Sequence, residues 1–257
     1  MRLKIFAGRK ALPDPPPPPP EPSPLDVFVK PDSLAINKAR QDHLATLGLD
    51  LSNKTVLEVG AGIGLHTQFF IDGGCAVTIT DGDPANVAAI RKRYPDHDVR
   101  SLDLDLALDA ESLGRFDIVY CYGTLYHLQH PDAALSRMAS VCSGQILLET
   151  IVAPGAHAEL HLVTEPPTSD QAVGGVGCRP TRLWVLEALR RHFGHAYATL
   201  TQPDHPDFEM DWTLTKSFGN MRAIFVGSRA PLCLPALTEE LPVRHCPAPQ
   251  PSPTSTG

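Results

Sequence analysis

A glycine-rich turn between two apolar stretches constrains this sequence more than any other feature. The turn follows an apolar run, Thr55 to Val59, that is typical of a buried strand, and it carries glycines at positions 60, 62 and 64. The next apolar stretch, Leu65 to Ile71, has helical spacing. Glycines permit positive φ and close approach of a ligand, and a helix start offers unpaired N–H groups. The sequence therefore predicts a site for a nucleotide-like ligand at this turn.

The spacing of the glycines separates two classes of ligand. A dinucleotide fingerprint reads G-x-G-x-x-G, and Leu65 occupies the position of its third glycine. Glu58, at the end of the strand, would repel a pyrophosphate but could accept a hydrogen bond from an ammonium group. The pattern E-x-G-x-G-x-G therefore suits a ligand with an amine and no phosphate, and an accidental glycine-rich turn is the alternative.

Most of the remaining chain alternates strand and helix patterns. Five apolar runs of strand length, the first at 55–59 and the last at 145–149, are separated by segments with helical spacing. This order predicts an α/β protein with a doubly wound parallel sheet and right-handed crossovers. Ligands of such sheets bind at the carboxyl ends of the strands. Four candidate residues lie at such ends: Glu58, Asp81, Asp103 and Cys121.

Two acids compete for the ribose of a nucleoside ligand. Asp81 ends the second predicted strand, 21 positions after Gly60, where a carboxylate can accept hydrogen bonds from both ribose hydroxyls. Asp83 precedes Pro84 at the start of a predicted helix, so it is more simply an N-cap. We therefore expect Asp81 to hold the ribose, with a plain turn residue as the alternative.

The pattern from Glu58 to Gly64 resembles motif I of the class I S-adenosylmethionine-dependent methyltransferases. The segment 122–128 resembles the one that begins the fourth helix in members acting on small molecules, and the likeness extends over about residues 25–228. It implies a Rossmann-like sheet of seven strands, mostly parallel, with a sixth strand at 197–201 and an antiparallel last strand at 222–228. It also implies S-adenosylmethionine as cofactor and methyl transfer as the reaction.

The resemblance assigns the predicted site residues to parts of the cofactor. Asp103 would accept from the adenine amine while Leu104 packs on the ring, with Asp105 as a rival for the acid. Cys121 would end the fourth strand beside the methionine part. The methionine part itself would be held by the residues of motif I: Glu58, Gly60, Ala61, Gly62 and Gly64.

Tyr126 and His127 are the candidate catalytic residues. They follow the fourth predicted strand, near the expected mouth of the substrate site, and either could orient or deprotonate an acceptor. A structural pair that packs on the loop 129–131 is the alternative.

Residues 153–179 are polar and too long for a simple connector, so we expect them to cover the acceptor site. Within them His157, Glu159 and His161 alternate as metal ligands could. Because no further ligand is apparent, we expect a solvated or substrate-facing stretch and no metal.

Composition limits the class of protein. The formal net charge of −7 argues against a nucleic-acid binder, which needs a basic surface. None of the six cysteines forms a C-x-x-C pair, and no apolar run has the length of a membrane span, so we expect a cytoplasmic protein without membrane contact. Residues 25–230 should form one domain between a proline-rich disordered tail at 1–24 and a second disordered tail at 231–257.

The sequence thus predicts methyl transfer from S-adenosylmethionine to a small-molecule acceptor, by analogy a polar metabolite or sugar-like compound. An NAD(P)-dependent oxidoreductase or epimerase is one alternative, but it would need a glycine at position 65 and a Tyr-x-x-x-Lys motif, and the sequence has neither. A non-catalytic S-adenosylmethionine-binding subunit, with proline-rich ends for partners, is the other. The sequence does not indicate an oligomeric state.

Overall fold

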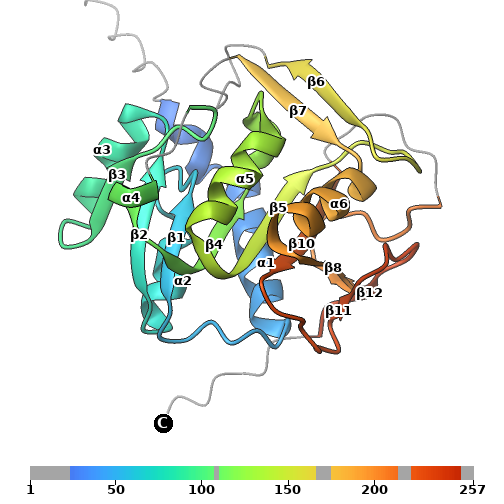
Figure 1. Cartoon of the computed structure of the whole chain (residues 1–257). Coiled ribbons are helices and arrows are strands. Elements are labelled where there is room, and N and C mark those ends of the chain that lie inside the picture. Colours follow the sequence, from blue (N-terminus) through green and yellow to red (C-terminus); the bar gives the residue numbers. More distant parts are fainter. Residues whose placement is uncertain (1–23, 107–109, 166–174, 214–220, 250–257) are drawn as a thin grey trace, which may run out of the picture.

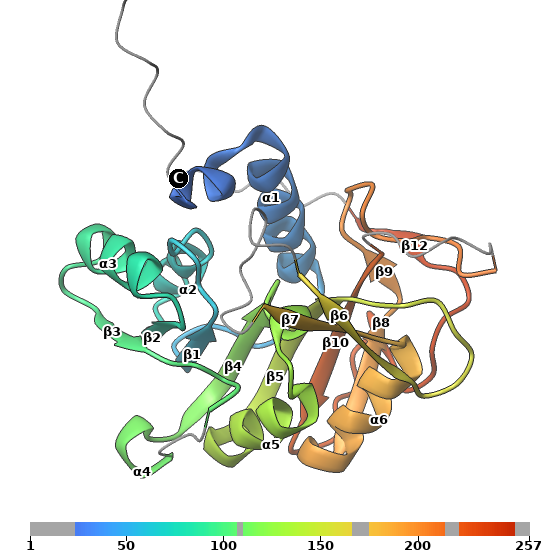
Figure 2. The same cartoon turned by 90° about the horizontal axis from the view of Figure 1, so that it is seen from above.

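A central sheet with helices on both faces organises the chain (Figures 1 and 2). The computed structural model describes residues 24–106, 110–165, 175–213 and 221–249. The rest of the sequence lies outside these ranges: nearly all of the predicted N-terminal tail, the end of the predicted C-terminal tail, residues 166–174 of the predicted cover, and residues 107–109 and 214–220.

The described residues form an eight-stranded sheet in the order β11-β8-β10-β5-β4-β1-β2-β3. Its five parallel strands are β1 (Thr55–Val59), β2 (Ala76–Asp81), β3 (Asp98–Ser101), β4 (Phe116–Tyr122) and β5 (Cys142–Ile151). The antiparallel part consists of β10 (Arg222–Ser228), β8 (His195–Thr199) and the short edge strand β11 (Leu237–Thr238).

The predicted α/β fold with an antiparallel last strand is confirmed, with two differences in detail. The sixth predicted strand begins two residues earlier, as β8, and is followed by the separate strand β9 (Thr201–Gln202). The eighth strand, β11, spans only two residues, which is too short to produce a periodic pattern in the sequence.

The helices form two layers (Figure 2). One layer contains α1 (Pro31–Thr46), α2 (Thr67–Asp72) and α3 (Pro84–Arg93), and the other contains α4 (Ala110–Leu113), α5 (Pro131–Val141) and α6 (Arg182–Phe193). Two 3-10 turns, η1 (Pro24–Val29) and η2 (Leu125–His127), and a hairpin of β6 (Leu160–Thr164) with β7 (Val176–Pro180) complete the described elements near the site.

Alternation along the strands produces two apolar cores, one on each face of the sheet. In β4, Val119 and Cys121 belong to the core beneath α5 and α6, whereas Ile118, Tyr120 and Tyr122 belong to the core beneath α1 and α2. Successive side chains of a strand point to opposite faces, so one buried strand supplies both cores. No helix among the described residues is long and apolar enough to cross a membrane.

Residues 231–249 contradict the prediction of a disordered C-terminal tail over 231–257. They add β11 to the edge strand β8, and β12 (Cys246–Pro247) pairs with β9. Leu237 is buried, and the amide of Leu200 donates to the carbonyl of Ala236 at 2.8 Å. The composition is rich in proline, but pairing to an existing strand edge orders this segment without a helix or strand pattern of its own.

We expect Leu148→Ala to destabilise the fold by about 2–5 kcal/mol, because Leu148 is fully buried in the middle of the sheet and its truncation leaves a cavity. Leu162→Ala is the matched control, since Leu162 is 56% exposed on the hairpin and should change stability by only about 0.5 kcal/mol. Urea unfolding of both variants measures the difference. Equal stabilities would contradict the position of Leu148 in the core.

Candidate functional site

The glycine turn after β1 leaves no room for side chains. Gly60, Gly62 and Gly64 have φ of 63°, 59° and 73°, a region that favours glycine. A Cβ on Gly60 would lie 2.2 Å from the Oγ1 of Thr124, and one on Gly62 would lie 2.6 Å from the Phe28 ring. The sequence-based interpretation of a bare backbone turn is therefore supported, and Thr124 and Phe28 form the walls around it.

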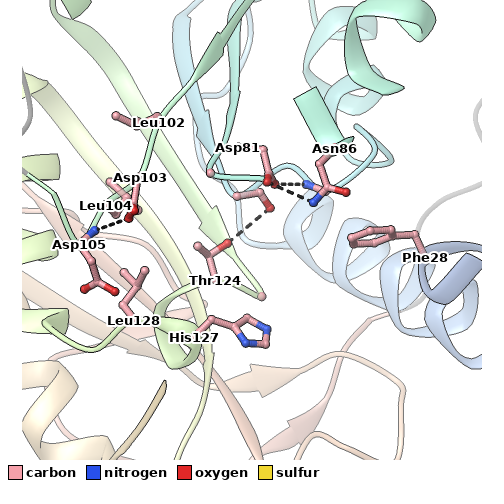
Figure 3. A pocket seen from close by; sticks show the side chains of 14 residues that line it. Phe28, Asp81, Asn86, Leu102, Asp103, Leu104, Asp105, Thr124, His127 and Leu128 are labelled. Atoms are coloured by element: carbon pink, nitrogen blue, oxygen red, sulfur yellow. Dashed lines mark hydrogen bonds between the residues drawn. The ribbon is translucent and has the colours of Figure 1, made fainter. Parts of the chain in front are cut away.

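Asp81, at the end of β2, braces this turn (Figure 3). Its carboxylate accepts hydrogen bonds from the amides of Gly62 at 2.8 Å and Asp83 at 2.9 Å, and from the Nδ2 of Asn86 at 3.1 Å. Asp83 instead caps α3, because its Oδ1 accepts from the amide of Ala85 at 2.7 Å. The structure thus separates the two acids as predicted: Asp83 is the N-cap, and Asp81 faces a cavity.

The first cavity lies at the carboxyl ends of β1, β2, β3 and β4 (Figure 3), and its volume is about 600 Å³ including space open to solvent. Asp103, Leu104 and Asp105, from the loop after β3, all line it. The Asp105 carboxylate already accepts from the amides of Gln129 at 3.0 Å and His130 at 2.8 Å. Asp105 is thus engaged through both oxygens, whereas Asp103 accepts from the amide of Asp105 at 2.9 Å through its Oδ1, which favours Asp103 as the acid available to a ligand.

Cys121 does not lie where the sequence led us to expect it. The side chain is fully buried in the core beneath α5, and it is absent from the lining of both cavities described here. The alternation of β4 turns Cys121 away from its neighbours Tyr120 and Tyr122, which do face the second cavity. The next turn residues, Gly123 and Thr124, line the first cavity instead.

A second cavity of about 840 Å³ adjoins the first, and the two share Phe28, Gly60, Gly62 and Gly123. Ala61 also lines it, whereas Gly64 lines neither cavity and lies beneath the turn, against Tyr94. The polar lining of the second cavity comes from segments far apart in the sequence and includes Arg40, Glu58, His66, Tyr120, Tyr122, Tyr126 and Arg222.

A buried ion cluster supports this cavity. The two oxygens of Glu149 accept from the Nη2 of Arg40 at 2.6 Å and from the Nη1 of Arg222 at 3.0 Å. Burial alone would raise the pKa of Glu149, but the two guanidinium charges outweigh it and hold that pKa below its ordinary value. The sequence did not predict this cluster. The local signal for it was Glu149, a carboxylate within the apolar run of β5.

Glu58 is enclosed at the base of the turn. Its carboxylate accepts from the Oγ1 of Thr67 at 2.6 Å, and the residue is 2% exposed. Burial raises the pKa of Glu58 to about 7; the hydrogen bond from Thr67 opposes this shift, and the charge of Asp81 adds to it. Glu58 therefore changes protonation near neutral pH in the ligand-free protein.

Four buried side-chain atoms of residues that line the second cavity have no hydrogen-bond partner among the described residues: the Nε2 of His66, the hydroxyl of Tyr122, and the Nε atoms of Arg40 and Arg222. The Nδ1 of His66 lies 2.5 Å from the hydroxyl of Tyr120. Burial and the nearby Arg40 lower the pKa of His66 to about 3, so the imidazole is neutral. Buried polar groups without partners are rare, and their presence here indicates a site for a hydrogen-bonding ligand.

The two candidate catalytic residues are neighbours in η2 and line different cavities. Tyr126 faces the second cavity, where its hydroxyl accepts from the Nη2 of Arg222 at 3.3 Å. His127 faces the first cavity, and its Nδ1 lies 2.6 Å from the Oε2 of Glu165. Glu165 was not predicted, because it follows β6, 38 residues further along the chain.

Of the alternating residues His157, Glu159 and His161 in the predicted cover, only Glu159 and His161 form an ion pair among the described residues. The Nε2 of His161 and the Oε2 of Glu159 lie 3.5 Å apart, and the side chains are 37% and 53% exposed. In the part of the chain that the structure describes, no three His, Cys, Asp or Glu side chains are grouped as a metal site requires.

A parallel sheet with a glycine turn after its first strand and carboxylates at the ends of β1 and β2 defines a nucleoside-binding Rossmann-like protein. The family model for the methyltransferase domain matches residues 33–201, and the chain belongs to this family. The sequence-based prediction of an S-adenosylmethionine-dependent methyltransferase domain is thus confirmed at the level of the family.

The chain is similar to several named proteins. It is 35% identical over 125 residues to a tRNA U34 carboxymethyltransferase of Dichelobacter nodosus, which covers 45% of this chain and 38% of that protein. It is 34% identical over 125 residues to a ubiquinone biosynthesis O-methyltransferase of Xanthomonas oryzae pv. oryzae, covering 46% and 51%. The chain thus spans less than half of the first relative and about half of the second.

Among solved structures, the N-terminal domain of EvdMO1, determined in the presence of SAH and D-fucose, superposes with a TM-score of 0.57. The identity is 22%, and the match covers 77% of this chain and 83% of that one. This likeness supports the fold.

We expect the stability of the wild-type protein to fall relative to Glu58→Gln as pH rises from 5 to 8. Between pH 4.5 and about 7 the folded protein retains a proton on Glu58 that the unfolded chain has lost, so this group costs stability as pH rises. The shift corresponds to about 3 kcal/mol at pH 8.

Urea unfolding at several pH values measures this difference. Glu187→Gln, which changes an exposed residue of α6, is the control and should show no such trend. A difference between Glu58→Gln and wild type that does not change with pH would contradict the buried, protonated state of Glu58.

Proposed function

We propose that this protein transfers a methyl group from S-adenosylmethionine to a small polar molecule. The observation that supports this proposal is the second cavity, which opens from the first at the shared glycines and presents buried polar atoms without partners. A concave site with apolar and aromatic walls and a few convergent polar groups is typical of small-ligand sites. The first cavity would hold the nucleoside, and the second would hold the methionine part and the acceptor.

The residues of the first cavity fit the nucleoside. Asp81 would accept from the ribose hydroxyls, and its hydrogen bond from Gly62 would fix the turn at the same time. Asp103 would accept from the adenine amine while Leu104 and Leu128 pack on the ring. The predicted roles of Asp81, Asp103 and Leu104 thus remain our proposal.

The residues at the second cavity fit the methionine part. The backbone from Gly60 to Gly62, with Ala61 between, would pass beneath it. Its ammonium would lie toward Glu58, and its carboxylate would pair with Arg40, whose guanidinium lies close to Gly123. An ammonium at Glu58 would also favour the ionised form of this carboxyl.

The bound cofactor supplies a methyl group on a positively charged sulfur. The chain would hold the acceptor in line with that group and exclude water, which accounts for much of the rate of such a transfer. Tyr126 would orient the acceptor, and the Nε2 of His127 would accept its proton where the acceptor is an acid or alcohol. The β6–β7 hairpin, which packs on η2, would cover the acceptor site.

A small acceptor is favoured over a nucleic acid by charge. The chain carries a net charge of −7, and the walls of the first cavity include three aspartates. The match to the relative named a tRNA U34 carboxymethyltransferase covers only 38% of that protein. This match alone therefore does not assign a tRNA acceptor to this chain. A sugar-like acceptor remains a proposal by analogy.

We expect Asp81→Ala to weaken S-adenosylmethionine binding by about ten-fold to a hundred-fold, since a hydrogen bond to a charged group contributes about 1.5–3 kcal/mol. Asp83→Ala is the matched control: it removes the exposed N-cap two residues away, costs about 1 kcal/mol of stability, and should leave binding unchanged. Titration calorimetry compares the two. Wild-type affinity in Asp81→Ala would reject the proposed nucleoside site.

We also expect label from methyl-labelled S-adenosylmethionine to appear in the small-molecule fraction of a cell extract incubated with the protein. Gly62→Arg is the inactive control, because position 62 has positive φ and lies against Phe28. Label in tRNA would overturn the small acceptor. Cofactor binding without transfer to either fraction would instead support a non-catalytic subunit.

A further inference from the structure

Two buried arginines from segments far apart in the sequence line the second cavity. Arg40 lies on α1 and Arg222 begins β10, and their side chains are 8% and 10% exposed. Because β10 runs antiparallel to β5, Arg222 lies opposite Ile151, the last residue of β5. The fold therefore places the Arg222 guanidinium at the edge of the sheet where ligands of such proteins bind.

The protein satisfies only part of the hydrogen-bonding capacity of these two groups. A guanidinium has five N–H donors and no acceptor. Among the described residues, Arg40 donates to Asn37 at 3.0 Å and to Glu149 at 2.6 Å. Arg222 donates to Glu149 at 3.0 Å and to the hydroxyl of Tyr126 at 3.3 Å. The remaining donors of each group have no hydrogen-bond acceptor among the described residues, which leaves them to solvent or to a ligand.

The wall of the second cavity carries more positive than negative charge. Its acid is Glu58, and burial raises the pKa of Glu58 to about 7. Glu149 offsets one of the two arginine charges from behind, since it lines neither cavity. Asp207 is a weaker partner, because its carboxylate lies 3.5 Å from the Nε of Arg222 and its side chain is 32% exposed. The cavity therefore favours ligands with negative charge.

The cofactor would engage one of the two arginines. In the proposed function, the carboxylate of the methionine part pairs with Arg40, close to Gly123, and its ammonium lies toward Glu58. Arg222 then faces the cavity without an anion from the cofactor, and the positively charged sulfur adds to the positive potential around it. Opposite charges attract strongly at short range in a partly buried site. An acceptor with a negatively charged group would supply the counter-charge.

Tyr126 adds a second kind of donor beside Arg222. Its hydroxyl oxygen accepts from the Nη2 of Arg222, so the hydroxyl hydrogen is available to another group. The guanidinium carbons of Arg222 and Arg179 lie 5.0 and 5.4 Å from the centre of the Tyr126 ring, which holds this ring between two cations. A guanidinium with a neighbouring O–H donor matches the lone pairs of a carboxylate or a phosphate.

We propose that Arg222 and Tyr126 bind an oxyanion group of the acceptor, so that the protein methylates a small organic acid with a carboxylate or phosphate group. This inference rests on the proposed methyl transfer and narrows its acceptor. The oxyanion holds the acceptor, and another atom of the acceptor receives the methyl group, so the product keeps its negative charge. That atom bonds to the methyl carbon as the carbon–sulfur bond breaks with its electron pair on sulfur, and any proton that the atom carries passes to water.

The charge of the labelled product tests the acceptor class with the wild-type protein. The small-molecule fraction of the extract incubated with methyl-labelled S-adenosylmethionine is passed over an anion exchanger at pH 7. We expect the labelled product to be retained, while unreacted S-adenosylmethionine, which is cationic, passes through. Elution at pH 2 releases a carboxylic acid, whereas a phosphate ester keeps a charge and is released by phosphatase treatment. A labelled product that passes through at pH 7 would overturn the inference and leave the methyl transfer standing.

Matched variants test the separate roles of the two arginines. Arg40→Lys and Arg222→Lys each keep a positive charge beside Glu149 and lose the fork of donors. Titration calorimetry should show S-adenosylmethionine binding about ten-fold weaker in Arg40→Lys and within about two-fold of wild type in Arg222→Lys. At limiting acceptor, methyl transfer by Arg222→Lys should fall by about ten-fold to a hundred-fold, because its contact to a charged group is lost.

Arg244→Lys is the control, since Arg244 is 73% exposed and pairs with Asp211, and it should match wild type in both assays. Cofactor binding that weakens equally in Arg40→Lys and Arg222→Lys would overturn the inference, because both arginines would then hold the cofactor. The product-charge measurement needs no variant, so it decides the acceptor class even where Arg222→Lys fails to fold. Absence of cofactor binding by the wild-type protein would instead reject the proposed function.

Discussion

A fully buried carboxylate shared by two arginines joins the first long helix to the middle of the sheet. Glu149 on β5 binds Arg40 of α1 and Arg222 of β10, and all three are less than 10% exposed. A buried charge costs several kcal/mol unless its partners are present, so these three elements can pack only in this register. The position of α1 as a wall of the second cavity, and of Arg222 beside Tyr126, depends on this cluster.

The same principle applies to the carboxylates that face the ligand. Asp81 is buried, but two backbone amides and an asparagine satisfy it, whereas Glu58 has only Thr67 and is close enough to Asp81 for their charges to interact. In the ligand-free site, the carboxylate of Asp81 is thus well hydrogen-bonded, whereas Glu58 has a pKa near neutral pH. A cation bound at Glu58 would favour the ionised form of this carboxyl, and the ammonium of the proposed cofactor is such a cation.

Much of the fold, and the clustering of several candidate site residues at one edge of the sheet, could be predicted from local sequence patterns. Apolar runs of strand length gave the parallel strands, and their carboxyl ends placed Glu58, Asp81 and Asp103 near one another. The prediction for Cys121 was wrong because a position at a strand end does not reveal which face the side chain takes. The C-terminal prediction was wrong for residues 231–249 because pairing to β8 and β9 orders them in spite of their composition.

The sequence by itself determined the class of sheet, the bare glycine turn and the N-cap role of Asp83, because each is expressed within a few consecutive residues. Only the tertiary structure decided the partners of Glu149, which lie 109 and 73 positions away, and the pairing of His127 with Glu165 across 38. These contacts follow from the order of strands in the sheet and from the docking of a hairpin on η2. Local periodicity contains no information about either arrangement, since it reports only which face of an element is buried.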